Sequence, residues 1–517
     1  MRAADVLVET LTAQGVDLCF TNPGTTEMHL VAALDRHPAM RSVLCLFEGV
    51  ATGAADGYAR IAGKPAATLF HLGPGLANGL ANLHNARRAH SPVVNIIGDH
   101  ARAHLPLDPP LASDIAGMAG PVSRWVETVV DPGEAAEKTV AAVRAAYGPA
   151  PGVASLILPA DCAWDENAPP PIGAQDMPGR KPVAESTIAA AAEALRAAKS
   201  PVIFLGGPAL GEAGLRAAGR IAAATGARLV METFPARVAR GAGRVSAVRL
   251  NYFAEGAAND LKDADLMLLA GARAPISFFA YPGKPASFVP EGATLHEFGT
   301  AADNLAPALA ALADALGAPA DPPLAPRATA PAIGNPEAKL NAAQVGLSLL
   351  RYLKDGAIIC DDSTTSGLGV YSWLENGPDH DWLCLTGGAI GLGMPLAVGA
   401  ALAAPGRPVI SLNGDGAAAY TLQALWTQAR EGQKIVNIVF ANHSYLILNV
   451  ELAKLGDGPP GAIARRMLSL DEPRLDWVKL AQGFGVEAQR ASTVGAFDAA
   501  LEAALAADGP QLLVAEV

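Results

Sequence analysis

The sequence predicts an α/β protein with three doubly wound parallel sheets, one in each of three domains. Short apolar runs alternate with segments of helical periodicity along the whole chain. Two proline-rich stretches, 169–182 and 319–336, interrupt this alternation and are predicted to be linkers. Several of the apolar runs end in glycine-rich loops, as strands of open α/β sheets do near ligands. We therefore expect domains at 1–170, 183–320 and 338–517.

The individual elements follow from periodicity. In the first domain, apolar residues at helical spacing predict the helices 3–14, 50–61 and 76–88. Apolar runs predict the strands 17–21, 42–47, 66–70 and 93–97, with a loop at 71–75. The second domain is expected to contain the helix 185–198 and the strands 201–205 and 266–269. The third is expected to contain the strands 357–360, 409–413, 435–441 and 512–514, and the helix 421–432.

Composition excludes several classes of protein. Of the 517 residues, 51% are hydrophobic and only 17% are charged, which excludes a disordered chain. The formal net charge of −12 offers no basic surface for nucleic acid or for an anionic membrane. The five cysteines are scattered without a CxxC pair, and no signal peptide is evident, so a reducing, cytoplasmic location is expected.

One uncharged stretch, 383–406, is long enough to imitate a membrane span. It contains six glycines and has Pro395 in its middle. Glycine clusters suit close approach of the backbone to a ligand. A glycine-rich loop followed by a short buried helix at 394–404 is therefore the better interpretation.

The strongest local signal lies in the third domain. Gly414-Asp415-Gly416 follows one buried strand, and Asn442 ends the next strand along the chain. Adjacent parallel strands would bring these side chains together, and carboxylate, amide and phosphate oxygens suit Mg²⁺. Gly416 would let the backbone approach a phosphate. The alternative is that Gly-Asp-Gly is merely a turn.

This pattern resembles a known family. Gly414-Asp415-Gly416, followed 26 residues later by Asn442, resembles the thiamine diphosphate motif of the 2-oxo acid decarboxylases and acetolactate synthases. The stretch from Glu48 to Arg60, EGVATGAADGYAR, resembles the helix that carries the catalytic glutamate of that family. The resemblance covers the whole chain. It implies pyrimidine-binding, central and diphosphate-binding domains in that order.

The resemblance also implies roles for individual residues. Glu48 would hydrogen-bond the pyrimidine ring of the cofactor; surrounded by Leu46, Phe47 and Val50, it would be buried with a raised pKa. The alternative for Glu48 is a carboxylate at a helix N-terminus. The implied metal ligands are Asp415, Asn442 and the backbone carbonyl of Ser444. The implied cofactor contacts are Thr364, Thr365, Gly388, Ile390, Gly414, Gly416, Ala417 and Asn442. For the two threonines, an ordinary turn remains the alternative.

Three positions resemble the pocket of benzoylformate decarboxylase. Asn22-Pro-Gly-Thr25-Thr-Glu27 resembles the loop that binds the substrate carboxylate, with Thr25 in place of a serine. His71 falls at the position of a catalytic histidine. The alternative is a loop histidine that hydrogen-bonds the backbone. Leu448 is apolar, where pyruvate decarboxylase has a glutamate.

The sequence also departs from both enzymes. The second active-site histidine of benzoylformate decarboxylase would fall near 278–281, where this chain has none. Motifs typical of acetolactate synthase are missing between residues 98 and 125. Its flavin-side motif is replaced by the segment 271–275, so FAD is not expected. His100 and His104 could face either the pocket or solvent.

The expected function is thiamine diphosphate- and Mg²⁺-dependent decarboxylation of a 2-oxo acid, carboligation to a 2-hydroxy ketone, or both. The alternatives are an acetolactate synthase-type enzyme and, more remotely, a non-catalytic cofactor-binding paralogue. The family implies a homodimer or homotetramer with active sites at subunit interfaces. We expect a small-molecule 2-oxo acid as substrate, and neither a nucleic acid nor a membrane as partner.

Overall fold

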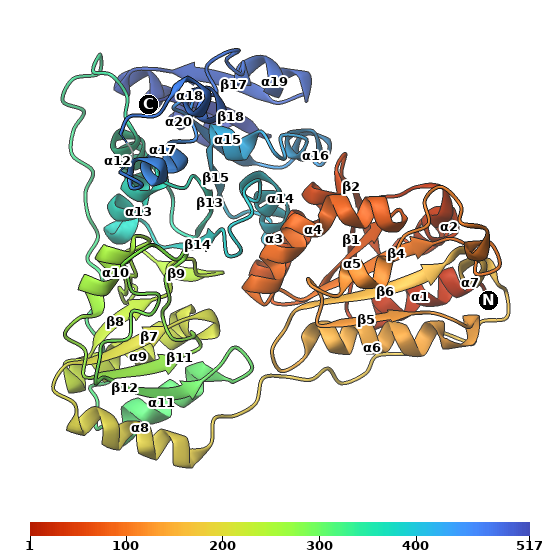
Figure 1. Cartoon of the computed structure of the whole chain (residues 1–517), viewed down its shortest axis with the longest axis horizontal. Coiled ribbons are helices and arrows are strands. Elements are labelled where there is room, and N and C mark those ends of the chain that lie inside the picture. The colour runs from red at the N-terminus through yellow and green to blue at the C-terminus, as the bar shows by residue number, and fades with distance from the viewer. Residues whose placement is uncertain (457) are drawn as a thin grey trace.

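Three α/β units, each built on its own sheet, make up the structure (Figure 1). The computed structural model describes residues 1–456 and 458–517. The N-terminal unit is red to orange in Figure 1, the middle unit yellow to green, and the C-terminal unit green-blue to blue. The predicted linkers 169–182 and 319–336 contain no helix and no extended strand. The predicted fold class is confirmed.

The first sheet has the strand order β2-β1-β3-β4-β6-β5, and all its neighbouring strands are parallel. Its strands are β1 (Leu18–Asn22), β2 (Arg41–Leu44), β3 (Ala66–Phe70), β4 (Val93–Asp99), β5 (Trp125–Thr128) and β6 (Val153–Pro159). The helices of this unit are α1 (Ala3–Ala13), α2 (Met28–Arg36), α3 (Glu48–Ala62), α4 (Leu72–Ala89), α5 (Ile115–Ala119), α6 (Ala135–Tyr147) and α7 (Ala160–Trp164).

Two predictions for this unit were wrong in detail. The strand expected at 42–47 is the edge strand β2, which ends at Leu44 and begins with two exposed residues. The loop expected at 71–75 is the first turn of α4, which begins at Leu72. Pro74 belongs to that turn because the first backbone N–H groups of a helix have no partner within it, so proline costs nothing there.

The second sheet is also parallel, with the order β10-β8-β7-β11-β12. Its strands are β7 (Pro201–Leu205), β8 (Arg228–Met231), β10 (Val248–Arg249), β11 (Leu266–Ala270) and β12 (Thr294–Gly299). Its helices are α8 (Glu185–Ala197), α9 (Glu212–Thr225), α10 (Ala254–Leu261) and α11 (Leu305–Ala315).

The third sheet has seven strands in the order β17-β18-β16-β15-β13-β14-β9. Its strands are β9 (Val238–Arg240), β13 (Ala357–Asp362), β14 (His380–Cys384), β15 (Val409–Gly414), β16 (Ile435–Ala441), β17 (Glu487–Ala491) and β18 (Gln511–Glu516). Its helices are α12 (Ala342–Tyr352), α13 (Gly367–Trp373), α14 (Gly393–Ala403), α15 (Asp415–Ala418), α16 (Ala424–Arg430), α17 (Leu446–Ala453), α18 (Ala462–Leu468), α19 (Trp477–Gly483) and α20 (Val494–Ala506).

The edge strand β9 comes from the middle part of the chain and runs antiparallel to β14. Nothing in the periodicity predicted this exchange. Ion pairs lie beside the β9–β14 pairing. Asp381 of β14 accepts hydrogen bonds from Arg237, which is next to β9, and from Arg407. One strand from the middle part of the chain therefore completes the edge of the C-terminal sheet.

Helix α14 accounts for the uncharged stretch that imitates a membrane span. It is apolar on all sides and is buried from Gly393 to Ala400, mainly against α3. The two helices cross closely at glycines: a Cβ on Gly57 would lie 2.1 Å from the Leu396 carbonyl oxygen, and one on Gly399 would lie 1.8 Å from that of Ala54. Among the described residues, no helix has both the length and the apolarity needed to cross a bilayer.

Candidate active site

Asp415 lies at the carboxyl edge of the third sheet, where the neighbouring parallel strands β15 and β16 end. Its Oδ1 accepts a hydrogen bond from the Gly416 backbone N–H at 2.8 Å, and its Oδ2 accepts one from that of His443 at 2.7 Å. Burial of the carboxyl group raises the pKa of Asp415. The carboxylate is thus fixed between two loops and keeps lone pairs free for a cation.

The segment after β16 wraps around Asp415. The Oδ1 of Asn442 accepts a hydrogen bond from the Ser444 backbone N–H at 3.0 Å, and His443 between them has a left-handed φ of 54°. A carboxylate, an amide oxygen and a backbone carbonyl are the donors that Mg²⁺ prefers. Among the described residues, no group of three or more His, Cys, Asp or Glu side chains forms a metal site.

Two glycines beside this carboxylate lie close to neighbouring side chains. A Cβ on Gly416 would lie 2.4 Å from the Tyr445 ring, and one on Gly414 would lie 4.0 Å from the Thr364 hydroxyl. Thr364 follows β13, has a left-handed φ of 49° and is exposed, whereas Thr365 is half-buried. Ala417 is buried in the short helix α15. The structure therefore brings Thr364 together with the Gly-Asp-Gly turn at one sheet edge, where a diphosphate could contact backbone N–H groups.

Gly388 and Ile390 lie in the loop between β14 and α14. Gly388 has a left-handed φ of 77°, and a Cβ there would lie 3.0 Å from the Phe278 ring. Phe278 belongs to the segment in which the expected second histidine is missing, and it packs against Phe234 and Tyr252. An aromatic side chain of the middle unit therefore covers this loop.

Glu48 begins helix α3 at the carboxyl edge of the first sheet. Its carboxylate accepts a hydrogen bond from the Asn78 amide at 3.0 Å. A Cβ on Gly75 would lie 3.3 Å from Glu48 and 3.6 Å from the Cβ of His71, so the two predicted residues are close neighbours. Within one chain, Glu48 is half-buried and its neighbour Leu46 is 43% exposed. The burial of Glu48 at an interface between subunits stays a prediction.

His71 is held by a buried carboxylate that the sequence did not single out. The Nδ1 of His71 lies 2.8 Å from the carboxylate of Glu27 and 3.2 Å from the Thr26 hydroxyl. Glu27 is fully buried and also accepts hydrogen bonds from the Gly24 backbone N–H and the Thr26 hydroxyl. Thr25, the predicted carboxylate-binding residue, is exposed beside them and makes no side-chain hydrogen bond within the described residues.

The remaining candidates lie around these groups. Leu448 is on α17 and is 47% exposed. One turn further along that helix, Glu451 accepts a hydrogen bond from the Tyr281 hydroxyl at 2.9 Å, which ties the segment containing Phe278 to α17. His100 follows β4 with its ring edge-on to the exposed His104, at a centroid distance of 5.5 Å. Within the part of the chain that the structure describes, no hydrogen bond or ring pair joins either of these histidines to His71.

Comparisons with known proteins identify the family. The profile "Thiamine pyrophosphate enzyme, N-terminal TPP binding domain" matches residues 1–118, and the corresponding "C-terminal TPP binding domain" profile matches residues 367–515. The first match contains Thr25, Glu48 and His71, and the second contains the candidate residues from Gly388 onward, whereas Thr364 and Thr365 lie just before it. The chain belongs to the thiamine pyrophosphate enzymes.

Relatives within this family cover the whole chain. A Mycobacterium tuberculosis protein with the provisional name acetolactate synthase large subunit IlvX is 49% identical over 99% of this chain and 98% of its own length. Benzoylformate decarboxylase of Pseudomonas aeruginosa is 30% identical over 98% of this chain and 97% of its own length. The solved structure of the thiamine diphosphate-dependent 4-hydroxybenzoylformate decarboxylase of Rhodococcus jostii matches with a TM-score of 0.87 and 27% identity, covering 100% of this chain and 99% of that one.

This thiamine pyrophosphate enzyme is therefore related to both benzoylformate decarboxylase and acetolactate synthase, as the sequence motifs predicted. Sequence reasoning missed Glu27, Asn78 and Phe278. A usable signal existed for Asn78: it begins a series with Asn82 and Asn85 at helical spacing along an otherwise apolar face.

Proposed function

We propose that the chain decarboxylates a 2-oxo acid with the help of thiamine diphosphate and Mg²⁺, and releases an aldehyde or joins it to a second carbonyl compound. The observation that carries this proposal is the His71–Glu27 pair beside Glu48. A histidine that can pass protons to and from a reacting substrate suits decarboxylation to an aldehyde.

The residues of the third sheet hold the cofactor in this proposal. Asp415, Asn442 and the carbonyl of Ser444 bind Mg²⁺, while Gly414, Gly416, Ala417, Thr364 and Thr365 receive the diphosphate. Gly388 would offer its carbonyl to the aminopyrimidine, and Ile390 would support the bound cofactor. When bound, thiamine diphosphate supplies the carbon nucleophile and accepts the electron pair that CO₂ leaves behind.

The residues of the first sheet handle protons. Glu48 shares a proton with the pyrimidine ring nitrogen, and Asn78 holds the carboxylate in place by donating a hydrogen bond to it. Glu27 accepts a hydrogen bond from the Nδ1–H of His71, and in this tautomer Nε2 faces the substrate as a proton acceptor. Thr25 offers its free hydroxyl to the substrate carboxylate.

The pocket favours a bulky apolar substrate side chain. Phe278 lies against Gly388, and Leu448 presents a second apolar surface from α17. Neither residue can pair with a charged or strongly polar substituent. We therefore expect an apolar 2-oxo acid, aromatic or branched, to be preferred over pyruvate.

The active form is proposed to be a homodimer or homotetramer with each site shared between two chains. Asn85 of α4 contacts the Gly388 loop, and His71 lies fourteen residues earlier, just before the same helix. At 1.5 Å per residue along α4, His71 lies about 20 Å from Asn85. In this proposal, a second chain supplies the other half of each site.

A panel of 2-oxo acids with product analysis by mass spectrometry tests this proposal. Aldehyde from an apolar 2-oxo acid supports it. Acetolactate from pyruvate would instead favour the second candidate, an acetolactate synthase-type enzyme, which the name of the 49% identical relative favours. The variant Glu48→Gln should lose turnover, and unchanged turnover would overturn the catalytic assignment of Glu48.

A further inference from the structure

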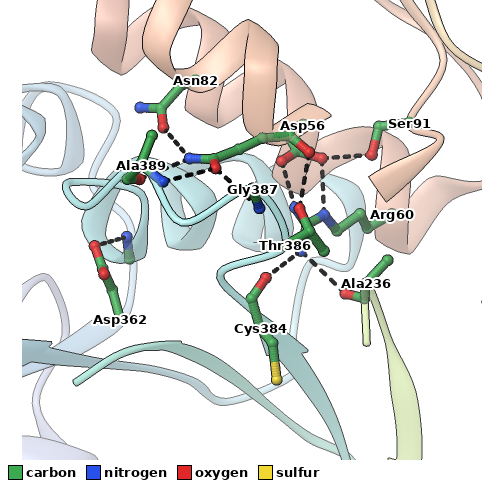
Figure 2. Close-up of polar contacts among 12 residues, drawn as sticks. Asp56, Arg60, Asn82, Ser91, Ala236, Asp362, Cys384, Thr386, Gly387 and Ala389 are labelled. Carbon is green, nitrogen blue, oxygen red and sulfur yellow. Dashed lines mark hydrogen bonds and ion pairs between the residues drawn. The ribbon is translucent and has the colours of Figure 1, made fainter. Parts of the chain in front are cut away.

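The loop that carries Gly388 and Ile390 is held by side chains from the first domain. Figure 2 shows Arg60 of α3 beside the Cys384 carbonyl and Thr386, at the point where β14 leads into this loop. Arg60 is buried and paired with Asp56, so this anchor is rigid. The loop therefore rests on helices α3 and α4 rather than on its own sheet alone.

Asn85 of α4 makes the densest set of contacts with the loop. Its Oδ1 accepts hydrogen bonds from the backbone N–H groups of Gly387 at 3.1 Å and Ala389 at 3.3 Å. Its Nδ2 donates to the Ala389 carbonyl and to the Oδ1 of Asn82, both at 2.8 Å. The side chain is fully buried. One amide thus binds the residues on both sides of Gly388.

Neighbouring residues complete the clamp. The Nε2 of His84 lies 3.1 Å from the Gly387 carbonyl, and Thr386 donates to the Asn85 backbone carbonyl at 2.8 Å. Asn82 donates to the Gly391 carbonyl at 3.3 Å. Within the described residues, however, neither the N–H nor the carbonyl of Gly388 forms a hydrogen bond, although both flanking residues are bonded. Among the three carbonyls of the Gly387–Ala389 segment, the clamp leaves only that of Gly388 available.

We propose that Asn85 is a positioning residue, whose side-chain amide fixes the Gly387–Ala389 segment so that the free carbonyl of Gly388 can receive the aminopyrimidine of thiamine diphosphate. This inference rests on the role of Gly388 in the proposed function. Asn85 does not touch the cofactor itself; it acts through the loop backbone.

The variant Asn85→Asp tests this inference without changing the size of the side chain. A carboxylate can still accept from Gly387 and Ala389, but it cannot donate to the Ala389 carbonyl or to Asn82, and it would repel both oxygens. We expect the Kd for thiamine diphosphate, measured by calorimetry with Mg²⁺ present, to rise about 10-fold to 100-fold. Deuterium exchange at C2 of the bound cofactor, measured by NMR after acid quenching, should slow as well.

Asn95→Asp is the matched control. Asn95 is equally buried in the same domain, but its amide bonds Thr68 and Ser155, away from the loop. Its variant should keep the wild-type Kd and exchange rate. His84→Ala, on the partly exposed face of α4, provides a second test should Asn85→Asp not fold, and it should raise the Kd by a smaller factor.

Wild-type Kd and C2 exchange in a folded Asn85→Asp protein would overturn the inference. If only His84→Ala folds, wild-type values in that variant would overturn the inference as well. An equal loss in Asn95→Asp would also overturn it, because Asn85 would then be a general stabilising residue. If the wild-type protein binds no thiamine diphosphate, the proposed function itself fails and this inference falls with it. That failure is distinguishable, because it appears before any substitution is made.

Discussion

At the scale of single residues, the orientation of His71 depends on Glu27. This carboxylate is fully buried, and its four acceptor positions are shared among Gly24, Thr26 and His71. It also requires Gly98, since a Cβ there would lie 1.8 Å from its Oε1. A charged group in such a place is retained only when every neighbour is arranged to satisfy it.

We expect Glu27→Gln to lower kcat/KM about 10-fold to 100-fold, because the amide can no longer accept from His71, Thr26 and Gly24 together and the ring loses its fixed tautomer. Steady-state kinetics with the preferred 2-oxo acid provides the measurement. The Kd for thiamine diphosphate should stay at the wild-type value, since Glu27 belongs to the substrate side of the site. A parallel loss of cofactor binding would show that Glu27 only stabilises the domain.

Sequence reasoning reached the residues whose chemistry is marked by a motif, such as Asp415 and Asn442 at the ends of buried strands. It did not reach Glu27 or Asn85. Their importance comes from partners that are distant in the chain, 44 residues away for the Glu27–His71 pair and 302 residues away for the Asn85–Gly387 pair. No local pattern encodes such a pairing.

At the scale of elements, the buried parallel strands were the most predictable part. The apolar runs predicted β3 and β7 with their observed bounds, because a strand covered on both faces is apolar at every position. The start of α4 and the origin of β9 were not predictable from periodicity. A first helical turn can contain glycine and proline, and a three-residue edge strand carries too few residues to show a pattern.

The crossing of α3 and α14 supplies a prediction about stability. We expect Gly57→Ala to destabilise the protein by about 2 kcal/mol or more, because the new methyl group would meet the Leu396 carbonyl and force the helices apart. Denaturant unfolding measures the effect. Gly483→Ala is the control, since nothing lies within 4 Å of its Cβ position, and it should be neutral or slightly stabilising. Equal stability of both variants would contradict the close crossing.

At the scale of the whole molecule, the proposed sharing of sites between chains predicts complementation. Glu48→Gln disables the first domain, and Asp415→Ala disables the third. In a mixed dimer, one site receives both defects and the other receives neither. We expect two inactive preparations, unfolded and refolded together in equal amounts, to recover roughly a quarter of wild-type activity. Activity that stays at the level of the separate variants would mean that each site is built from one chain.

The pH dependence of stability provides a second prediction at this scale. Burial, with a contribution from Arg240, lowers the pKa of His380 from 6.5 to about 4. Between pH 6.5 and pH 4, His380 is therefore protonated in the unfolded chain but not in the folded chain. The free energy of unfolding falls as the pH drops through this range. This loss amounts to about 3 kcal/mol at most. Above pH 6.5, His380 contributes no pH dependence.

Denaturant titrations of the wild type and His380→Gln at pH 7.5 and pH 4.5 measure this contribution. The variant should lose less stability between the two pH values, because glutamine cannot take up a proton. The difference between the two proteins removes the contribution of all other titrating groups. An identical loss in both would show that His380 is protonated in the folded state.

Helix α4 connects two active sites of the proposed dimer. Its first turn follows His71, which would serve the substrate of one active site, and Asn85 near its other end holds the cofactor loop of the second. A helix shifts as a stiff rod, so movement at one end appears at the other. Substrate binding at one site would then shift the Gly388 loop of the other site. The two catalytic centres of the dimer would therefore not turn over independently.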